Sequence, residues 1–364
     1  MAVRLACSGR PWWADACVWI VGFVLCGCAK PDSAGAERKE VGVSVIELGR
    51  VHGRSVALGT DHSGTAVVWT EESLLDASGI RSGIEYSRTV MSGSPPHDAV
   101  VLSSTSLDII DVAVGRDVSF LLLGRERSED GLATVCSIAI MEHSSENVGP
   151  ERWVLSGTYS RLNLTPLGLV VQGTGESVLL SPETGKQLEL GVELMSAGAM
   201  KVQAFSDSRL IGPVYGDCSE PRLVTVDVSR LSDNKVLPIS IDCYPGLGLY
   251  AAGNSIVLTS TRERSTLRAS TYDDSGQVTA TASTGVSPWG TFTVKDGVLI
   301  DSTLVLVVNQ SSPSRTIRIV QFETTSGIVQ DLLTIPGEAR AIAIGRDRDL
   351  IMQTSRGIVT RIEF

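Results

Sequence analysis

VAVGRD, from Val112 to Asp117, returns as IAIGRD from Ile342 to Asp347, and two looser copies are VALGTD from Val56 to Asp61 and LYAAGN from Leu249 to Asn254. In each copy a short apolar stretch ends at a Gly followed by polar residues, which is typical of a strand that turns back into the next strand. The four glycines are 56, 138 and 92 residues apart, and the last two intervals are three and two times 46. Short strands at this period indicate the blades of a β-propeller.

A second phrase recurs between copies of the first. It reads SPETGK from Ser181 to Lys186, YDDSGQ from Tyr272 to Gln277 and FETTSGI from Phe322 to Ile328. We interpret it as the hairpin between the two outer strands of a blade. An acidic metal loop is the competing interpretation, but the copy at Tyr272 lacks the alternating carboxylates and the later Glu that a calcium loop requires.

The two phrases divide the chain into seven units of about four strands, beginning near residues 54, 108, 160, 200, 247, 291 and 340. In the sixth unit we expect strands at residues 291–295, 303–309, 316–322 and 328–335. The seventh has room for only three strands between Arg340 and Phe364, whereas Val41 to Leu48 forms a strand ahead of the first unit. Pairing that strand with the last unit would close a ring and remove its exposed edges.

The expected fold is therefore all-β: a β-propeller, with seven four-stranded blades closed by pairing of the N-terminal strand with the last blade. Six or eight blades remain alternatives because the first three units are irregular. Two β-sandwiches in tandem would explain neither the period nor the incomplete last unit.

Composition agrees with a large all-β domain. The 364 residues are 43% hydrophobic but only 5% aromatic, with much Val, Leu, Ile, Ser, Thr and Gly, a mixture that favours short strands and tight turns. The formal net charge is −10. Because a nucleic-acid-binding protein needs a basic face to displace counterions from phosphates, nucleic acid is not an expected partner.

The N-terminal segment has the pattern of an export signal. Arg4 and Arg10 precede an almost unbroken apolar run from Ala16 to Leu25, which is too short to span a bilayer as a helix. Leu25-Cys26-Gly27-Cys28 follows and resembles the lipobox of bacterial lipoproteins. The resemblance implies that the signal is removed and that Cys28 becomes an acylated N-terminus, carrying palmitate or a similar chain.

The motif departs from the common lipobox in having Cys26 where Ala or Ser is usual, and Asp15 places a negative charge just before the apolar run. An ordinary signal peptide with a chance Cys is the alternative interpretation. Several acyl chains would hold such a protein stably, since each buried CH₂ contributes about 0.8 kcal/mol.

The expected organisation is a lipoprotein signal peptide over residues 1–27, a flexible tether over 28–40 and the propeller over 41–364. The tether is polar and contains Pro31 and Gly35, which break regular structure. No later stretch approaches 18 consecutive apolar residues, so lipid on Cys28 is the expected link to the membrane. The expected location is the bacterial cell envelope outside the cytoplasm, at the outer membrane or cell surface rather than the inner membrane.

Three cysteines remain after Cys28. Cys218 and Cys243 follow the second and fourth strands of the fourth unit, so we expect them to pair in an oxidising compartment. The alternative is that all three are buried small hydrophobes, which is the expectation for Cys136 in either case.

No motif for a metal or a cofactor emerges from the sequence. His52, His62, His97 and His143 have no partner at ligand spacing, and no Cys-x-x-Cys, phosphate loop or Gly-x-Ser-x-Gly elbow occurs in a fitting context. We therefore expect no metal site and no cofactor. Trp69, Trp153 and Trp289 lie in or after predicted strands and are expected to pack between blades rather than to form a ligand platform.

Two functions are compatible with this sequence. The favoured one is a non-enzymatic binding or assembly scaffold that presents propeller loops to an envelope protein, a peptide or a glycan. In overall architecture alone, such a protein resembles the propeller lipoproteins that assist outer-membrane protein assembly. The alternative is an extracytoplasmic enzyme of a propeller class, a glycan hydrolase or lyase, which would bring three or more carboxylates or histidines together at one mouth of the central channel.

Overall fold

The computed structural model describes residues 43–61, 63–75, 77–79, 81–91, 97–103, 109–127, 133–173, 177–194, 200–214, 222–240, 248–252, 255–262, 266–283, 290–300, 303–312, 314–326, 328–344 and 349–364. These residues belong to one compact unit, residues 42–364, which contains seven antiparallel four-stranded sheets. The predicted signal peptide and tether, with Cys28, lie outside the described residues.

Each of the first six sheets uses four consecutive strands, ordered from the channel outward, and the seventh combines the two ends of the described chain. Blades 1 and 2 contain β2 (Arg54–Thr60), β3 (Ala66–Leu75), β4 (Arg81–Met91), β5 (His97–Ser103), then β6 (Ile109–Val114), β7 (Val118–Arg127), β8 (Ala133–Glu142) and β9 (Glu151–Ser156). Blades 3 and 4 contain β10 (Tyr159–Thr165), β11 (Gly168–Gly173), β12 (Ser177–Leu180), β13 (Gln187–Glu189), then β14 (Gln203–Ser206), β15 (Arg209–Val214), β16 (Arg222–Asp227) and β17 (Lys235–Ser240).

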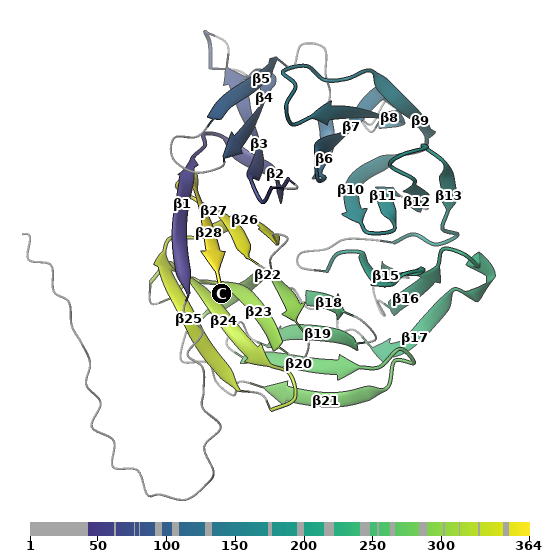
Figure 1. Cartoon of the computed structure of the whole chain (residues 1–364), viewed down its shortest axis with the longest axis vertical. Coiled ribbons are helices and arrows are strands. Elements are labelled where there is room, and N and C mark those ends of the chain that lie inside the picture. The colour runs from purple at the N-terminus through teal and green to yellow at the C-terminus, as the bar shows by residue number, and fades with distance from the viewer. Residues whose placement is uncertain are drawn as a thin grey trace, which may run out of the picture. The chain divides into compact units, whose positions relative to one another are not determined.

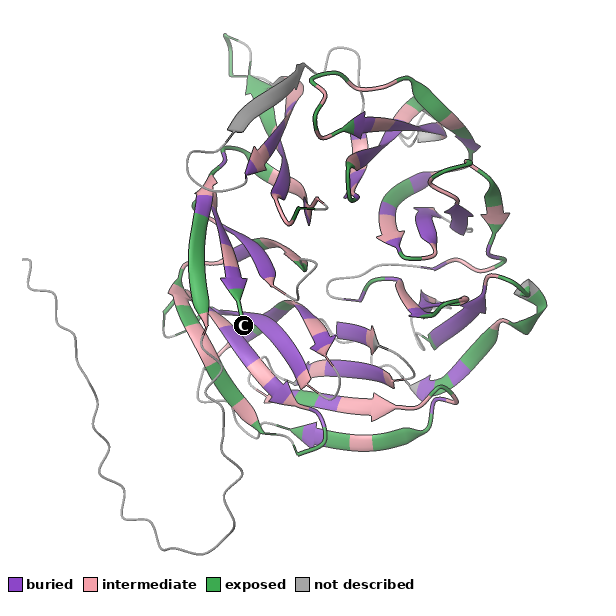
Figure 2. Ribbon diagram, viewed as in Figure 1, coloured by how far each residue is buried: buried purple, intermediate pink, exposed green. Residues whose placement is uncertain are grey.

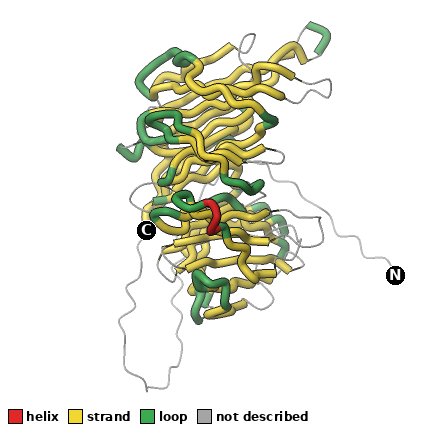
Figure 3. Tube along the Cα trace, turned by 90° about the vertical axis from the view of Figure 1, so that its right-hand side faces the viewer, coloured by secondary structure: helices red, strands yellow, loops and turns green. Residues whose placement is uncertain are grey.

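The remaining blades follow the same order. Blades 5 and 6 contain β18 (Gly248–Ala252), β19 (Ser255–Arg262), β20 (Thr266–Tyr272), β21 (Val278–Ser283), then β22 (Phe292–Ile300), β23 (Thr303–Gln310), β24 (Thr316–Glu323) and β25 (Val329–Pro336). Blade 7 contains β26 (Ala339–Ile344), β27 (Leu350–Thr354), β28 (Ile358–Glu363) and β1 (Ser44–Arg50). A 3₁₀ turn, η1 (Leu231–Asp233), is the one helical element of the described chain (Figure 3).

The blades form a ring around a central channel, with the first strand of each blade innermost (Figure 1). First strands of neighbouring blades contact one another at β2–β6, β6–β10, β14–β18, β18–β22 and β22–β26, and β26 contacts β2 to complete the circle. Between blades 3 and 4, the side-chain amide of Asn163 donates a hydrogen bond to the carbonyl of Val202. The predicted seven-bladed propeller is thus confirmed.

The ring closes where the two ends of the described chain meet. β1 pairs antiparallel with β28 from Ser44 opposite Glu363 to Arg50 opposite Ile358. A bulge between Glu47 and Gly49 carries this strand to Arg50, beyond the predicted end at Leu48. The side chain of Leu48 is buried to 2% exposure in the interface between blades 7 and 1, so the closing strand also contributes to the core.

The core lies between the blades (Figure 2). Middle strands are covered on both faces: β23 is buried along all but its first residue, and β11 along all but its last. This explains why LVLVV in β23 is a continuous apolar run, because a strand sandwiched between two neighbouring blades has no solvent face.

The second recurring phrase forms the outer hairpins, as predicted. It connects β12 to β13, β20 to β21 and β24 to β25. In the copy at Tyr272, the Asp273 carboxylate accepts hydrogen bonds from the Ser275 N–H, the Ser275 hydroxyl and the Gln277 N–H at 2.9, 2.7 and 2.9 Å. These bonds use the carboxylate to fix a turn.

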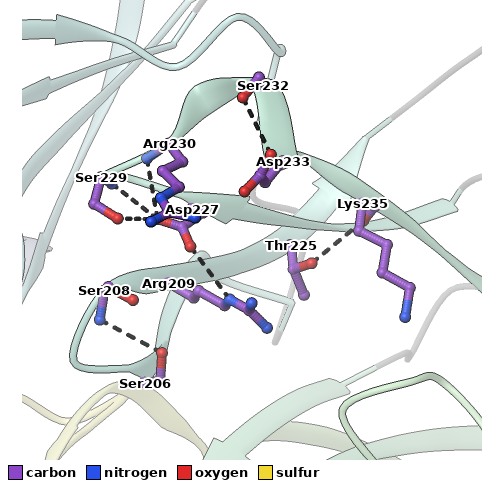
Figure 4. Close-up of polar contacts among 10 residues, drawn as sticks. All are labelled: Ser206, Ser208, Arg209, Thr225, Asp227, Ser229, Arg230, Ser232, Asp233 and Lys235. Atoms are coloured by element: carbon purple, nitrogen blue, oxygen red, sulfur yellow. Dashed lines mark hydrogen bonds and ion pairs between the residues drawn. The ribbon is translucent and has the colours of Figure 1, made fainter.

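The outer hairpin of blade 4 uses the same device with a different sequence (Figure 4). The Asp227 carboxylate accepts hydrogen bonds from the N–H and hydroxyl of Ser229 at 2.9 and 2.6 Å, and from the Arg230 N–H at 3.2 Å. The hydrogen bonds from Ser229 lower the pKa of Asp227. Arg209 lies 3.6 Å from the same carboxylate as an ion pair, so this acidic side chain is committed to the turn.

Candidate binding site at the central channel

The first strands of five blades line one end of the channel. A cavity of about 600 Å³ is bounded by residues 56–58 of β2, 111–114 of β6, 161–164 of β10, 293–296 of β22 and 340–342 of β26, together with Lys201. A second cavity of about 640 Å³ adjoins it over blades 6, 7 and 1 and shares Thr293, Lys295 and Arg340 with it. Both volumes fall within the range of ligand pockets.

A β-bulge recurs near the start of these five strands. The register against the second strand shifts at Val56 in β2, Ile110 in β6, Ser160 in β10, Lys295 in β22 and Arg340 in β26. A bulge leaves one residue unpaired and redirects its side chain. At two of these bulges the unpaired residue is a cation that lines both cavities, Lys295 in β22 and Arg340 in β26.

Basic side chains gather at this end. We call Arg54, Arg161, Lys295 and Arg340 the basic mouth; all four are exposed and line one or both cavities. Arg54 forms an exposed ion pair with Glu71 at 3.4 Å, and Glu338 is the acidic residue in the second cavity. The mouth therefore carries an excess of positive charge on a chain whose formal net charge is −10.

The carboxylates of the first cavity are Asp111 and Asp296, and each has a partner. Asp111 Oδ2 accepts a hydrogen bond from the Leu162 N–H at 2.8 Å and so joins blade 2 to blade 3. Burial raises the pKa of Asp111, against the effect of that hydrogen bond and of nearby Arg161. Asp296 Oδ2 lies 2.5 Å from Lys201 Nζ, and its Oδ1 accepts the Gly297 N–H at 2.9 Å.

The Lys201–Asp296 ion pair lies between two cavities of the channel. Both residues line the first cavity and also a further cavity of about 490 Å³ formed by the ends of the first strands. The lining of this further cavity combines aliphatic residues, including Leu58, Val114, Leu164, Val202, Val298 and Ile342, with polar residues such as Thr60, Asn163 and Gln203. Its amides are used between blades: Gln203 donates to the Leu249 carbonyl at 2.6 Å and accepts from the Ala251 N–H at 2.8 Å.

The channel thus has a charged, basic mouth, beyond which both aliphatic and polar residues line it. Among the described residues, two carboxylates line the first cavity, and no three His, Cys, Asp or Glu side chains gather closely enough to hold a metal ion. The constellation of three acidic or imidazole groups that the enzyme hypothesis requires is not found in this part of the chain.

The predicted disulfide cysteines cannot be located, because Cys218 and Cys243 lie outside the described residues. The strands that they follow, β15 and β17, are the second and fourth of blade 4, as expected. Cys136 is fully buried between blades 2 and 3, which confirms its predicted place in the core.

Trp69 and Trp153 pack between blades, as predicted, and Trp289 lies outside the described residues. Trp69 is fully buried and its indole N–H donates to the Ser119 hydroxyl of blade 2 at 2.9 Å. Trp153 of blade 2 packs directly over Gly185 in the outer hairpin of blade 3.

Of the four histidines, His52 is exposed, and His143 lies beside Ser119, 3.2 Å from its hydroxyl. The position of His62 and the side chain of His97 are not described. Burial lowers the pKa of His143, so its ring is neutral at physiological pH.

The described part of the chain contains no helix with the length and apolar character that a membrane crossing requires.

Sequence reasoning did not identify the basic mouth. Its residues come from blades 1, 3, 6 and 7 and are separated by up to 286 positions, from Arg54 to Arg340. Aligning the first strands of the units would have placed Lys295 and Arg340 at equivalent positions, but the bulges that define this alignment have no clear sequence signature.

No family model matches the chain, and no curated protein matches it in sequence. Solved structures do resemble it in fold. The WD40 domain of Pan2 from Neurospora crassa has a TM-score of 0.53 at 10% identity, covering 87% of this chain and 94% of that one. Streptogramin B lyase has a TM-score of 0.51 at 11% identity, with 88% and 97% coverage.

The β-propeller domain of the Trilobed protease from Pyrococcus furiosus, described as having an open velcro topology, has a TM-score of 0.51 at 8% identity and covers 84% of this chain and 93% of that one. In contrast to that description, the present ring is closed by a pair of strands. At such low identity these likenesses establish the fold alone. The chain is a seven-bladed β-propeller whose N-terminal strand completes its last blade.

Proposed function

We propose that this protein is a lipoprotein of the bacterial cell envelope, held outside the cytoplasm by lipid on Cys28, whose propeller binds a partner at the channel mouth without catalysing a reaction. The proposed location is the outer membrane or the cell surface. The partner is an envelope protein, a peptide or a glycan.

The anchor is supported by the sequence Leu25-Cys26-Gly27-Cys28, by the apolar run before it and by the polar residues after it. The closing strand begins at Ser44, 16 positions after Cys28. A lipid-bearing tether would therefore join the propeller beside its closure.

The observation that carries the binding function is the contrast within the first cavity. Its carboxylates, Asp111 and Asp296, are held by a backbone N–H and by Lys201, whereas Lys295 and Arg340 are exposed at the mouth. A general acid or base needs a carboxylate that can exchange a proton with a substrate. Here the acidic groups join parts of the ring, and the groups left accessible are cations that suit recognition.

Site-specific crosslinking tests this proposal. A photo-reactive amino acid would replace Thr293, which lines both cavities at the mouth, in the full-length protein expressed in its own bacterium. The control position is Gln187, exposed on the outer strand β13. After irradiation, the protein would be captured from membranes and its crosslinked products identified by mass spectrometry.

We expect a discrete product from Thr293 that is absent from Gln187. Absence of any product from Thr293, or the same products from both positions, would overturn the assignment of the mouth as the binding site.

A further inference from the structure

The fold does not require cations at the basic mouth. Lys295 and Arg340 occupy bulge positions whose equivalents in blades 1, 2 and 3 are Val56, Ile110 and Ser160. The same backbone device thus accepts apolar and small polar side chains elsewhere in the ring. Two cations at neighbouring blades therefore reflect a requirement other than the geometry of the strand.

Within the described residues, these two cations also form none of the ion pairs that occupy other charged groups. In the described part of the chain, no carboxylate lies within ion-pair distance of Lys295 or Arg340, whereas Lys201 pairs with Asp296 at 2.5 Å. The protein as a whole is negatively charged and repels anionic ligands. Exposed Lys and Arg side chains create a local positive potential that attracts such ligands. A cavity concentrates this effect, because its low-dielectric walls focus the field.

Aliphatic residues behind the mouth offer an anionic ligand a second kind of contact. The further cavity, of about 490 Å³, is lined by aliphatic residues alongside polar ones, and it shares Leu58, Val114 and Ile342 with the cavity at the mouth. A ligand that used both parts would place anionic groups against Lys295 and Arg340 and apolar groups beyond the Lys201–Asp296 pair. Phosphate and acidic polysaccharides could satisfy the first requirement only.

We propose that the basic mouth binds a peptide segment in which carboxylates stand next to apolar side chains, with the carboxylates on Lys295 and Arg340 and the apolar side chains directed into the channel. This inference rests on the proposed binding function and specifies its ligand. Hydrogen bonds between ionised partners are about twice as strong as neutral ones, so the two cations supply much of the affinity.

Binding can be measured with a fluorescein-labelled peptide that alternates Glu and Leu and ends in a free carboxylate, titrated with the purified full-length protein. Two matched peptides carry Gln in place of Glu, or Ser in place of Leu. Inorganic phosphate and an oligogalacturonate serve as competitors for the other anionic classes. The test variant is Lys295→Gln with Arg340→Gln.

The control variant is Lys186→Gln with Lys235→Gln, which removes the same charge from exposed sites near the outer strands of blades 3 and 4. Loss of each mouth cation should weaken the Glu–Leu peptide about tenfold, and loss of both about a hundredfold. The control variant should bind as the unaltered protein does. Added salt should weaken binding, since charges at an exposed mouth are screened over about 10 Å at 0.1 M.

Equal binding of the Glu and Gln peptides, or equal effects of the two double variants, would overturn the inference. Equal binding of the Leu and Ser peptides, or displacement of the peptide by phosphate or oligogalacturonate at similar concentration, would exclude the apolar part of the recognition and also overturn it. A partner crosslinked at Thr293 whose binding is unaffected by Lys295→Gln and Arg340→Gln would leave the scaffold function standing while this inference fails.

Discussion

Replacing Leu48 by Ala should destabilise the propeller even though Leu48 lies on the outermost strand of its blade. β1 is mostly exposed, but Leu48 retains 2% exposure and packs among apolar side chains from blades 7 and 1. Those neighbours are Val51, Ala66, Val68, Met91, Ile351 and Val359. Removing three carbon groups at about 0.8 kcal/mol each costs about 2.4 kcal/mol of transfer free energy. A cavity term brings the total loss in unfolding free energy to about 3 kcal/mol.

The assay is equilibrium urea unfolding of the residue 41–364 body alongside the full chain, followed by intrinsic tryptophan fluorescence. Val45→Ala is the matched control, because Val45 lies on the same strand with 45% exposure and should change the free energy of unfolding by no more than about 0.5 kcal/mol. Equal effects of Leu48→Ala and Val45→Ala would refute the packing of the closing strand into the core.

Three further predictions concern other parts of the ring. Gly185→Ala should lower the unfolding free energy by about 2 kcal/mol or more, because φ is +69° and a Cβ there would overlap the Trp153 indole. The control Gly79→Ala has a similar φ of +78° but nothing within 4 Å of the added Cβ, so it should cost only about 1 kcal/mol. Equal shifts in melting temperature for the two variants would contradict the packing of Trp153 over Gly185. Burial raises the pKa of Asp111, so its protonated form stabilises the fold at low pH, and that contribution is lost as the pH rises through the raised pKa. In urea unfolding at pH 7, Asp111→Asn should therefore be at least as stable as the unaltered protein, and the difference should shrink toward about pH 4. Asp111→Ala leaves the Leu162 N–H without its acceptor and should lower the unfolding free energy by about 1–3 kcal/mol. If Cys218 and Cys243 are paired, alkylation of the unreduced, denatured mature protein should label Cys136 alone, and labelling of three thiols would exclude the bridge.

The blade boundaries were predictable because the turns between strands are local. A Gly with a polar neighbour reverses the chain wherever it follows a short apolar strand, so units expected near residues 54, 108, 160, 200, 247, 291 and 340 correspond to first strands beginning at residues 54, 109, 159, 203, 248, 292 and 339. The closing strand was predictable because the last unit has room for only three strands, and a strand from the N-terminal end of the propeller could supply the fourth.

Bulges were not predictable. In the sixth unit the first strand was expected at residues 291–295, so that Asp296-Gly297 would lie beyond its end. β22 instead continues to Ile300, with a bulge at Lys295 and with Gly297 packed against Val305 and Leu306. Whether Asp-Gly forms a turn or a bulge depends on the neighbouring strand, which local sequence does not reveal. Two of the four cations of the basic mouth, Lys295 and Arg340, lie at such bulges and escaped detection for this reason.

The partners available to this propeller depend on its location in the cell. The claim that lipid on Cys28 holds it outside the cytoplasm is tested most directly by the N-terminus of the mature protein. The full-length protein would be isolated from membranes, digested, and its first peptide analysed by mass spectrometry, with Cys28→Ser processed in parallel. The account predicts a peptide that begins at Cys28 with added acyl mass, and its absence from the Cys28→Ser variant. An unmodified N-terminus beyond Cys28 would contradict the account.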